Sequence, residues 1–165
     1  RGPIGGTGMK ILAALDQTEY ADFVLLKAIK TAKQQNAKLD ILVVAEPPDR
    51  QAHGGNDDSV SDGGANDGGA ADALLEAATA AARRYRQKAR DSGLTAKMRV
   101  RAGSSPADEI IQYQRAEELD LIVLGRRSRS DAAAFPMGAV AQRVAAYATS
   151  TVMVVRCMTA RDRSA

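Results

Sequence analysis

Residues 119–125 read Leu-Asp-Leu-Ile-Val-Leu-Gly, a short apolar run that ends in glycine. Such a run is typical of a parallel strand that is buried on both faces. Residues 39–45, Leu-Asp-Ile-Leu-Val-Val-Ala, show the same pattern, and residues 10–16, Lys-Ile-Leu-Ala-Ala-Leu-Asp, form a third short apolar run. The three segments predict the central strands of one sheet.

Two outer strands are predicted from different patterns. In residues 95–102, apolar and basic side chains alternate (Ala96, Met98 and Val100 against lysine and arginine), which is typical of a half-exposed strand at a sheet edge. Residues 151–155, Thr-Val-Met-Val-Val, form the last strand.

Helical patterns separate these strands, at about 19–36, 71–91, 106–118 and 138–148. Thr18 is the expected N-cap of the first helix, and Gly93 is expected to end the second in a left-handed conformation. Ser104 or Ser105 caps the third helix, with Pro106 in its first turn. The apolar positions expected to face the core on the first helix are Phe23, Leu26, Ala28, Ile29 and Ala32.

Strands that alternate with helices imply parallel pairing and right-handed crossovers, so the predicted fold is a doubly wound α/β sandwich. Ligands of such folds bind at the carboxyl ends of the strands, where the strand order reverses. Asp16, Ala45, Gly103 and Gly125 all lie at or just after predicted strand ends.

The length of 165 residues fits one domain, which we assign to residues 9–156. Residues 1–8 read as a cloning remnant or flexible leader, and residues 157–165 as a C-terminal tail. Residues 49–72 hold six of the chain's 14 glycines and have six Asp against one Arg. With little to bury, this segment is predicted to be a mobile surface loop within the domain.

The charge balance argues against nucleic-acid and membrane partners. The formal net charge is +3, but Arg1 contributes +1 and the last ten residues contribute +2, so residues 2–155 sum to zero. The chain has no Trp and only 4% aromatic residues, too few for a platform that stacks single-stranded bases. No apolar run approaches the roughly 18 residues of a membrane span.

Because the chain has one Cys and one His, few catalytic or metal-binding arrangements of these residues are possible. Cys157 is expected to be a small apolar residue at a strand end, with an intermolecular disulfide or a reactive thiol as the alternative. His53 is expected to be an exposed loop residue. One Cys and no export signal favour the cytoplasm. Because no nucleophile–base pair is visible, the chain is not expected to be an enzyme, although slow ATP hydrolysis stays open.

The segment between Gly125 and Gly138 is the strongest candidate for a binding site. Gly125 is expected to end a strand, and Gly138 to open a helix whose unpaired N–H groups favour an anion. Three arginines and two serines lie between them within residues 126–130 and add donors for phosphate oxygens. The alternative is a basic surface loop followed by a capped helix.

The chain resembles the universal stress protein family over nearly all of residues 9–156. The resemblance rests on the strand at 10–16, the segment Ala102-Gly-Ser-Ser-Pro-Ala-Asp-Glu-Ile-Ile111, the segments Glu118–Gly125 and Gly138–Val144, and the strand Thr151–Arg156. It implies a five-stranded parallel sheet of order 3-2-1-4-5 between four helices, similar to adenine-nucleotide alpha-hydrolases. It also implies a homodimer, often formed through the last strand.

Nucleotide-binding members of that family carry Gly, two residues, Gly, nine residues, and then Gly followed by Ser or Thr. This chain keeps Gly125, Gly138 and the spacing, but has Ser128 and Ala139 at the other two positions. Ser128 restricts the backbone where glycine would be free. Ala139 removes a hydroxyl donor, a loss of about 1.5–3 kcal/mol for a hydrogen bond to a charged group.

The pocket that the resemblance implies would hold ATP or another adenine nucleotide, with Mg²⁺ if one is bound. Asp16 is either a ribose or metal contact or a plain strand-end carboxylate. The residues predicted to line the pocket are Asp16, Ala45, Gly103, Gly125, Arg126, Arg127, Ser128, Gly138, Ala139 and Val140. Two functions follow: a dimeric stress-response protein with a degenerate nucleotide cleft, or an interaction module of the same fold that binds an unknown protein partner.

Overall fold

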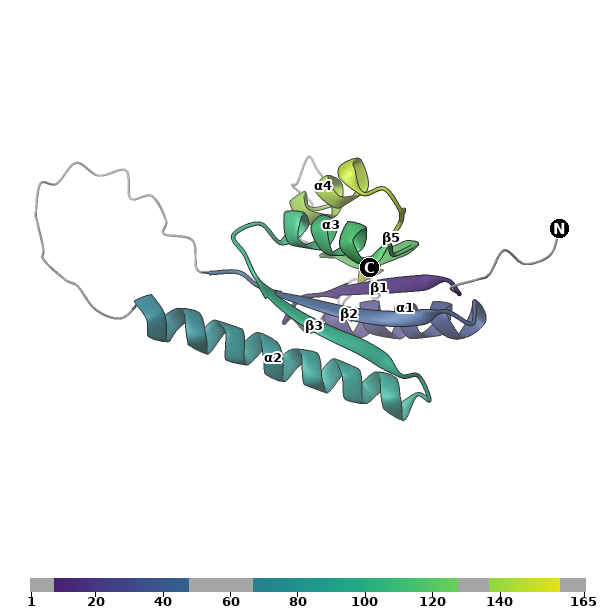
Figure 1. The fold of residues 1–165 in the computed structure, drawn as a ribbon, viewed down its shortest axis with the longest axis horizontal. Helices are drawn as coiled ribbons and strands as arrows, with labels where there is room; N and C mark the ends of the chain where they lie inside the picture. Colours follow the sequence, from purple (N-terminus) through teal and green to yellow (C-terminus); the bar gives the residue numbers. More distant parts are fainter. Residues whose placement is uncertain (1–7, 48–66, 128–136, 158–165) are drawn as a thin grey trace, which may run out of the picture.

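The computed structural model describes residues 8–47, 67–127 and 137–157, in which strands and helices alternate along the chain (Figure 1). The strands are β1 (Lys10–Leu15), β2 (Lys38–Ala45), β3 (Ala96–Ala102), β4 (Leu121–Arg127) and β5 (Thr151–Cys157). The helices are α1 (Ala21–Gln34), α2 (Asp67–Asp91), α3 (Pro106–Glu117) and α4 (Ala139–Tyr147).

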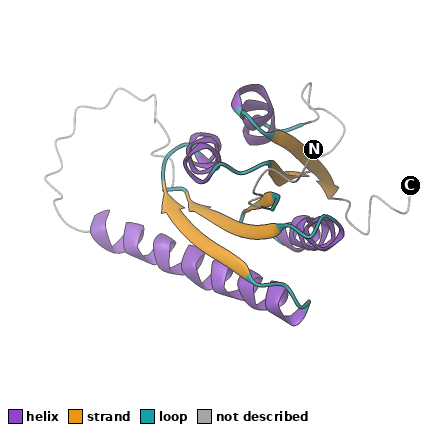
Figure 2. Ribbon diagram, turned by 45° about the vertical axis from the view of Figure 1, so that its right-hand side comes forward, coloured by secondary structure: helices purple, strands orange, loops and turns teal. Residues whose placement is uncertain are grey.

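All five strands form one parallel sheet in the order β3-β2-β1-β4-β5, which confirms the predicted fold class and strand order. Helices α1 and α2 cover one face, and α3 and α4 cover the other (Figures 1 and 2). The chain winds in one direction from β1 to β3 and in the other from β1 to β5. The strand order therefore reverses between β1 and β4.

Two apolar cores lie on the two faces of the sheet. In β1, Ile11, Ala13 and Leu15 pack toward α1 and α2, while Leu12 and Ala14 pack toward α3 and α4. Strand β4 follows the same alternation, because successive side chains of a strand point to opposite faces. The central runs are almost entirely apolar since both faces of the sheet are covered, with Asp40 of β2 as a buried exception.

Helix α1 differs from its prediction in its start and in its buried face. It begins at Ala21 after the N-cap residue Tyr20, and Thr18 is not the cap. Phe23 and Leu26, predicted to face the core, are 45% and 62% exposed. The residues that α1 buries are Ala21, Val24, Leu25, Ala28, Ile29 and Ala32, so only part of the predicted face was right.

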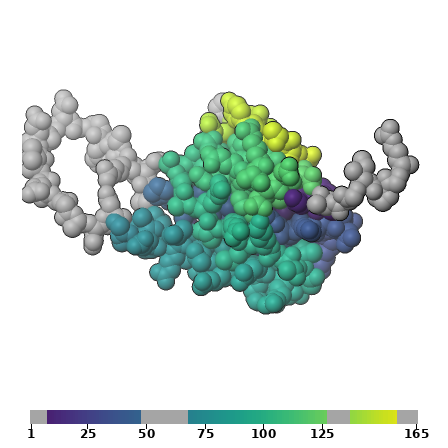
Figure 3. Space-filling model, in the orientation of Figure 1, coloured from purple at the N-terminus to yellow at the C-terminus, as the bar shows by residue number. Residues whose placement is uncertain are grey.

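Helix α2 begins at Asp67, about four residues before its predicted start, and so includes the end of the segment predicted as a loop over 49–72. Its 25 residues span about 37 Å. Its first turns extend beyond the strands (Figures 1 and 3), and residues 68–77 bury no side chain. From Ala78 onward the helix packs against β2 and β3.

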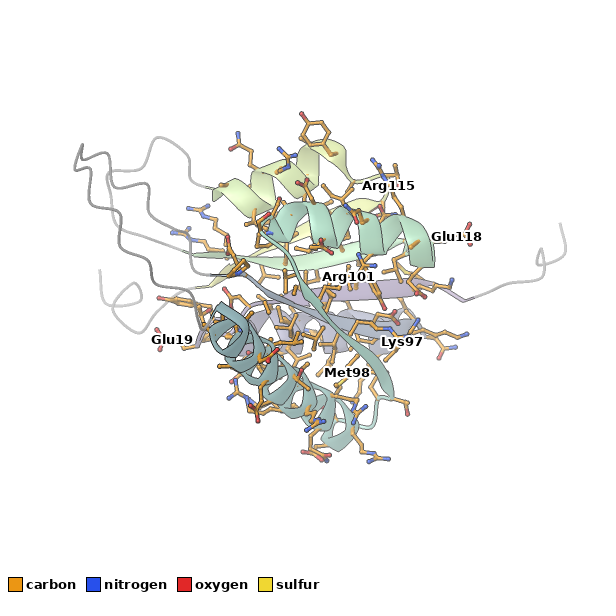
Figure 4. All side chains as sticks on the ribbon, turned by 60° about the vertical axis from the view of Figure 1, so that its left-hand side comes forward. Glu19, Lys97, Met98, Arg101, Arg115 and Glu118 are labelled. Carbon is orange, nitrogen blue, oxygen red and sulfur yellow. The ribbon has the colours of Figure 1, made fainter. Side chains whose placement is uncertain are left out.

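The edge strand β3, the glycine that follows α2 and the cap of α3 agree with the sequence prediction. Figure 4 shows Met98 on the side of α2 and Arg101 on the side of α3. Gly93 follows α2 with φ +82°. Ser105 caps α3, because its hydroxyl accepts a hydrogen bond from the Asp108 N–H at 3.4 Å.

Strands β4 and β5 both run two residues beyond their predicted ends. Gly125 pairs with Val155 inside the sheet, so the prediction that Gly125 ends the strand is wrong. Cys157 was predicted to lie at a strand end but was assigned to the tail over 157–165; it is the last residue of β5. The leader to residue 7, the loop over 48–66 with His53, and the tail from 158 lie outside the described residues. Within the described ranges, no helix is long and apolar enough to cross a bilayer.

Candidate functional site

The predicted site residues that the structure describes lie at the carboxyl ends of β1 to β4 and at the start of α4. The strand order reverses between β1 and β4. The last paired residues of β1 and β4 in the ladder are Ala14 and Leu124. Asp16 follows β1 directly, and Gly125 and Arg126 lie at the end of β4. An open parallel sheet has its crevice at such a point, because the two flanking crossovers leave on opposite faces.

Asp16 is exposed, and its carboxylate is bound locally. Oδ1 of Asp16 accepts hydrogen bonds from the backbone N–H of Thr18 at 3.0 Å and from its Oγ1 at 2.6 Å. Thr18 therefore orders the turn after β1, where it was predicted to cap α1.

A contact from α2 at the same position was not predicted from the sequence. The hydroxyl of Tyr85, a buried residue of α2, donates to the carbonyl oxygen of Asp16 at 2.8 Å. The guanidinium of Arg84 lies 3.3 Å from that hydroxyl and over the Tyr85 ring. Burial raises the pKa of Tyr85, so the hydroxyl keeps the proton that it donates. The two residues lie 69 positions apart in the chain, so no local sequence pattern predicts this contact.

Ala45 and Gly103 lie together at the ends of β2 and β3. The Gly103 N–H donates to the Ala45 carbonyl oxygen at 3.1 Å. A Cβ at position 103 would lie 2.7 Å from Cγ of Glu109, so the glycine lets this side chain pass over the backbone. Glu109 then reaches Arg101, with 3.1 Å between Oε2 of Glu109 and Nη1 of Arg101. The sequence pattern identified Gly103 as a site residue but did not predict that the Glu109 carboxylate lies beside it.

Gly138 is the N-cap of α4 and has φ +77° and ψ 148°, a conformation open mainly to glycine. Its carbonyl oxygen accepts from the Gln142 N–H at 3.0 Å. No side-chain cap of this helix occurs among the described residues, and no acidic residue lies in its first turn. Ala139 and Val140 are exposed there, and no described side chain binds the first N–H groups of α4, which can donate to an anion.

Arg126 combines partial burial with an unsatisfied donor. Its Nε is buried and has no hydrogen-bond partner within the described part of the chain. A buried donor without a partner costs about 1–3 kcal/mol, more when it is charged. Nε of Arg126 is therefore the donor of the described site that most clearly lacks a hydrogen-bond acceptor.

The remaining predicted residues are only partly placed. Arg127 is the last residue of β4, while Ser128, Arg129 and Ser130 lie outside the described residues. No group of three or more His, Cys, Asp and Glu residues suitable for a metal ion occurs within the described ranges. Asp16 is the only predicted Mg²⁺ ligand, and a Mg²⁺ ion bound there would rely mainly on nucleotide phosphates and water.

Comparison with known families gives one match over most of the chain. A sequence profile described as the universal stress protein family matches residues 9–156.

Comparison with solved structures shows the same fold. A universal stress protein family member from Burkholderia pseudomallei is 21% identical, with a TM-score of 0.69 over 92% of this chain and 98% of that one. A universal stress protein in complex with cAMP is 20% identical, with a TM-score of 0.67 over 93% and 100%. One from Archaeoglobus fulgidus in complex with dAMP is 18% identical, with a TM-score of 0.62 over 88% and 96%.

Proposed function

Because this chain belongs to the universal stress protein family, we propose that it is a non-catalytic, nucleotide-responsive protein of the stress response. Its ligand would be ATP or another adenine nucleotide, bound weakly at the carboxyl ends of β1 and β4. Two structural neighbours are described as complexes with cAMP and dAMP, which supports an adenine nucleotide as the ligand class.

The observation that carries this proposal is the start of α4. Gly138 opens the helix in a conformation that suits glycine, and among the described residues neither a capping side chain nor an acidic residue of the first turn competes for the helix N-terminus. The positive end of the helix dipole and the N–H groups of the first turn favour a phosphate there. This helix follows β4, so it begins at the edge of the sheet where the strand order reverses.

Five of the described residues would have distinct parts in holding the nucleotide. Asp16 has a carboxylate at the end of β1 that can accept from a ribose hydroxyl. Ala45 would offer backbone groups to the adenine edge, although its carbonyl already accepts from Gly103. Gly138, Ala139 and Val140 would offer N–H groups to phosphate. When present, Mg²⁺ would neutralise phosphate charge.

Two features explain why binding should be weak. Ala139 has no hydroxyl to donate to phosphate, and the Glu109 side chain, ion-paired with Arg101, lies against Gly103, a position predicted to line the pocket. The same features favour the second candidate function, an interaction module of this fold that binds no nucleotide.

Direct binding measurements separate the two functions. Acid extraction of the purified protein would reveal co-purified nucleotide, and calorimetric titration with ATP and Mg²⁺ would measure the affinity. The double variant Ser128→Gly with Ala139→Ser should gain about tenfold or more in affinity, because it restores a phosphate hydrogen bond. No released nucleotide, no heat at millimolar ATP and no gain in the double variant would favour the interaction module.

We also propose that the chain forms a homodimer through β5. The two edges of the sheet differ: β3 carries Lys97, Arg99 and Arg101, a common protection against edge pairing. Residues 151–155 of β5 carry no charge, and residues 152–155 are only partly buried within one chain. An uncharged edge strand with half-buried apolar side chains on both faces is suited to pairing with a second copy.

Light scattering after size-exclusion chromatography tests the dimer. Met153→Lys should give a monomer, because it places a charge on the β5 edge, and circular dichroism would verify that the variant is folded. Arg99→Val, a matched change on the opposite edge strand, should leave the dimer unchanged. A wild-type monomer, or a dimer that survives Met153→Lys, would contradict the assignment of β5.

A further inference from the structure

Two arginines lie side by side at the carboxyl end of the sheet. Arg126 of β4 and Arg156 of β5 are direct partners in the parallel ladder. Neighbouring strands are about 4.8 Å apart, so the two side chains leave the sheet close together. Ile122 and Leu124 of β4 pack toward α3 and α4, and the strand period places Arg126 on the same face. Val152 and Val154 place Arg156 there as well.

Neither guanidinium is neutralised within the described part of the chain. No ion pair or hydrogen bond joins Arg126 or Arg156 to any described acidic residue. The Asp16 carboxylate, at the end of the adjacent strand β1, accepts from Thr18. Asp108 on α3, which covers this face, forms its ion pair with Arg143 of α4.

This arrangement is unfavourable without an anion. Like charges directly opposite on adjacent strands repel, and the buried Nε of Arg126 has lost its hydration without gaining an acceptor. The first turn of α4, which has no acidic residue, adds a third source of positive potential on this side of the sheet. Two guanidinium groups can instead share one tetrahedral anion, since each presents a fork of donors that matches phosphate.

We propose that Arg126 and Arg156 form a phosphate-binding pair that holds the terminal phosphate of the nucleotide, which rests on the function proposed above. Arg126 thereby replaces the hydroxyl that is missing at Ala139. Arg156, outside the segment 125–140 that the family resemblance assigns to the cleft, extends the site onto β5. The pair makes the site selective for the number of phosphates: ATP binds more tightly than AMP.

Calorimetric titrations with ATP, AMP and inorganic pyrophosphate test this selectivity in the full chain. Arg126→Gln and Arg156→Gln should each weaken ATP binding about tenfold or more, and leave AMP binding within about twofold, because each removes a charge-assisted contact to the terminal phosphate only. Arg99→Gln, which removes an arginine of the other edge strand that forms no ion pair with a described residue, should change neither. Thermal unfolding would verify that each variant is folded.

The outcomes separate this proposal from the proposed function. Equal losses for ATP and AMP, or no loss for ATP, would overturn the phosphate-binding pair while nucleotide binding stands. If the wild type binds neither nucleotide, the nucleotide function fails. The arginine pair then stands only if pyrophosphate binds and both variants lose it, which would make free phosphate groups the ligand. Absence of pyrophosphate binding as well would overturn both.

Discussion

Removing the Tyr113 hydroxyl tests how much one buried contact between α3 and the sheet stabilises the fold. The hydroxyl donates to Oδ2 of Asp40 at 2.7 Å, and both residues are buried, with Asp40 8% exposed. Tyr113→Phe keeps the ring in the core and deletes only the donor. The carboxylate of Asp40 is then left at a buried position without this hydrogen bond.

The expected loss follows from the charge and burial of the acceptor. Hydrogen bonds to charged groups contribute about 1.5–3 kcal/mol, and a middle value of about 2 kcal/mol suits a pair that is almost fully enclosed. For a chain of 165 residues, each kcal/mol shifts the melting temperature by about 2–4 °C. Tyr113→Phe should therefore lower Tm by about 4–8 °C.

Urea unfolding and calorimetry would measure the effect, with Tyr147→Phe as the matched control. Tyr147 is 60% exposed on α4, so loss of its hydroxyl should change the free energy of unfolding by less than about 0.5 kcal/mol. A double-mutant cycle with Asp40→Asn isolates the pair. If Tyr113→Phe costs no more than Tyr147→Phe, or if the cycle shows no coupling, the contact does not stabilise α3 against the sheet.

Three further expectations concern the core, the start of α4 and alkaline pH. Leu25→Ala should cost about 2–5 kcal/mol because Leu25 is 1% exposed, whereas Leu26→Ala should cost less than about 0.5 kcal/mol; equal losses in urea unfolding would refute the observed face of α1. Gly138→Ala should cost about 1–3 kcal/mol because of its φ of +77°, while Gly68→Ala, in open space near the start of α2, should be neutral or slightly stabilising by thermal unfolding. Burial raises the pKa of both Tyr85 and Tyr113, so the unfolded chain loses its tyrosine protons first and the free energy of unfolding should fall as pH rises above about 10. Tyr113→Phe should make that fall shallower, and an unchanged slope would contradict the pKa shift.

The order of elements could be predicted because each central strand is buried on both faces and so has a nearly continuous apolar run, interrupted in β2 by Asp40. The buried face of α1 was harder to predict. Three of its six buried residues are alanines (Ala21, Ala28 and Ala32), while the large side chains of Phe23 and Leu26 point outward. These two large residues were the errors in the predicted face. The packing of α1 on strands β1, β2, β4 and β5 and on α2 selects its face.

At the site, the sequence predicted which residues lie at the strand ends, but it did not predict which side chains contact them. Asp16 was identified because it ends an apolar run, but the turn that holds it depends on Thr18, and its carbonyl is bound by Tyr85 from another helix. Gly103 was identified from a motif, while the side chain that passes over it belongs to α3. Partners of this kind are fixed by the packing of separate elements, which no local pattern encodes.

Arg126 and Arg156 show most clearly that a local sequence pattern does not predict contacts between separate elements. Along the chain, Arg126 belongs to a basic cluster with the residues that follow it, and its charge was interpreted together with theirs. In the fold, β4 continues through Arg126, and the β4–β5 register brings it beside Arg156, 30 positions later. A shift of the register by one residue would place Val155 or Cys157 opposite Arg126 and separate the two charges. The proposed phosphate-binding pair therefore depends on the register of two strands, and a sequence pattern can predict both strands without predicting that register.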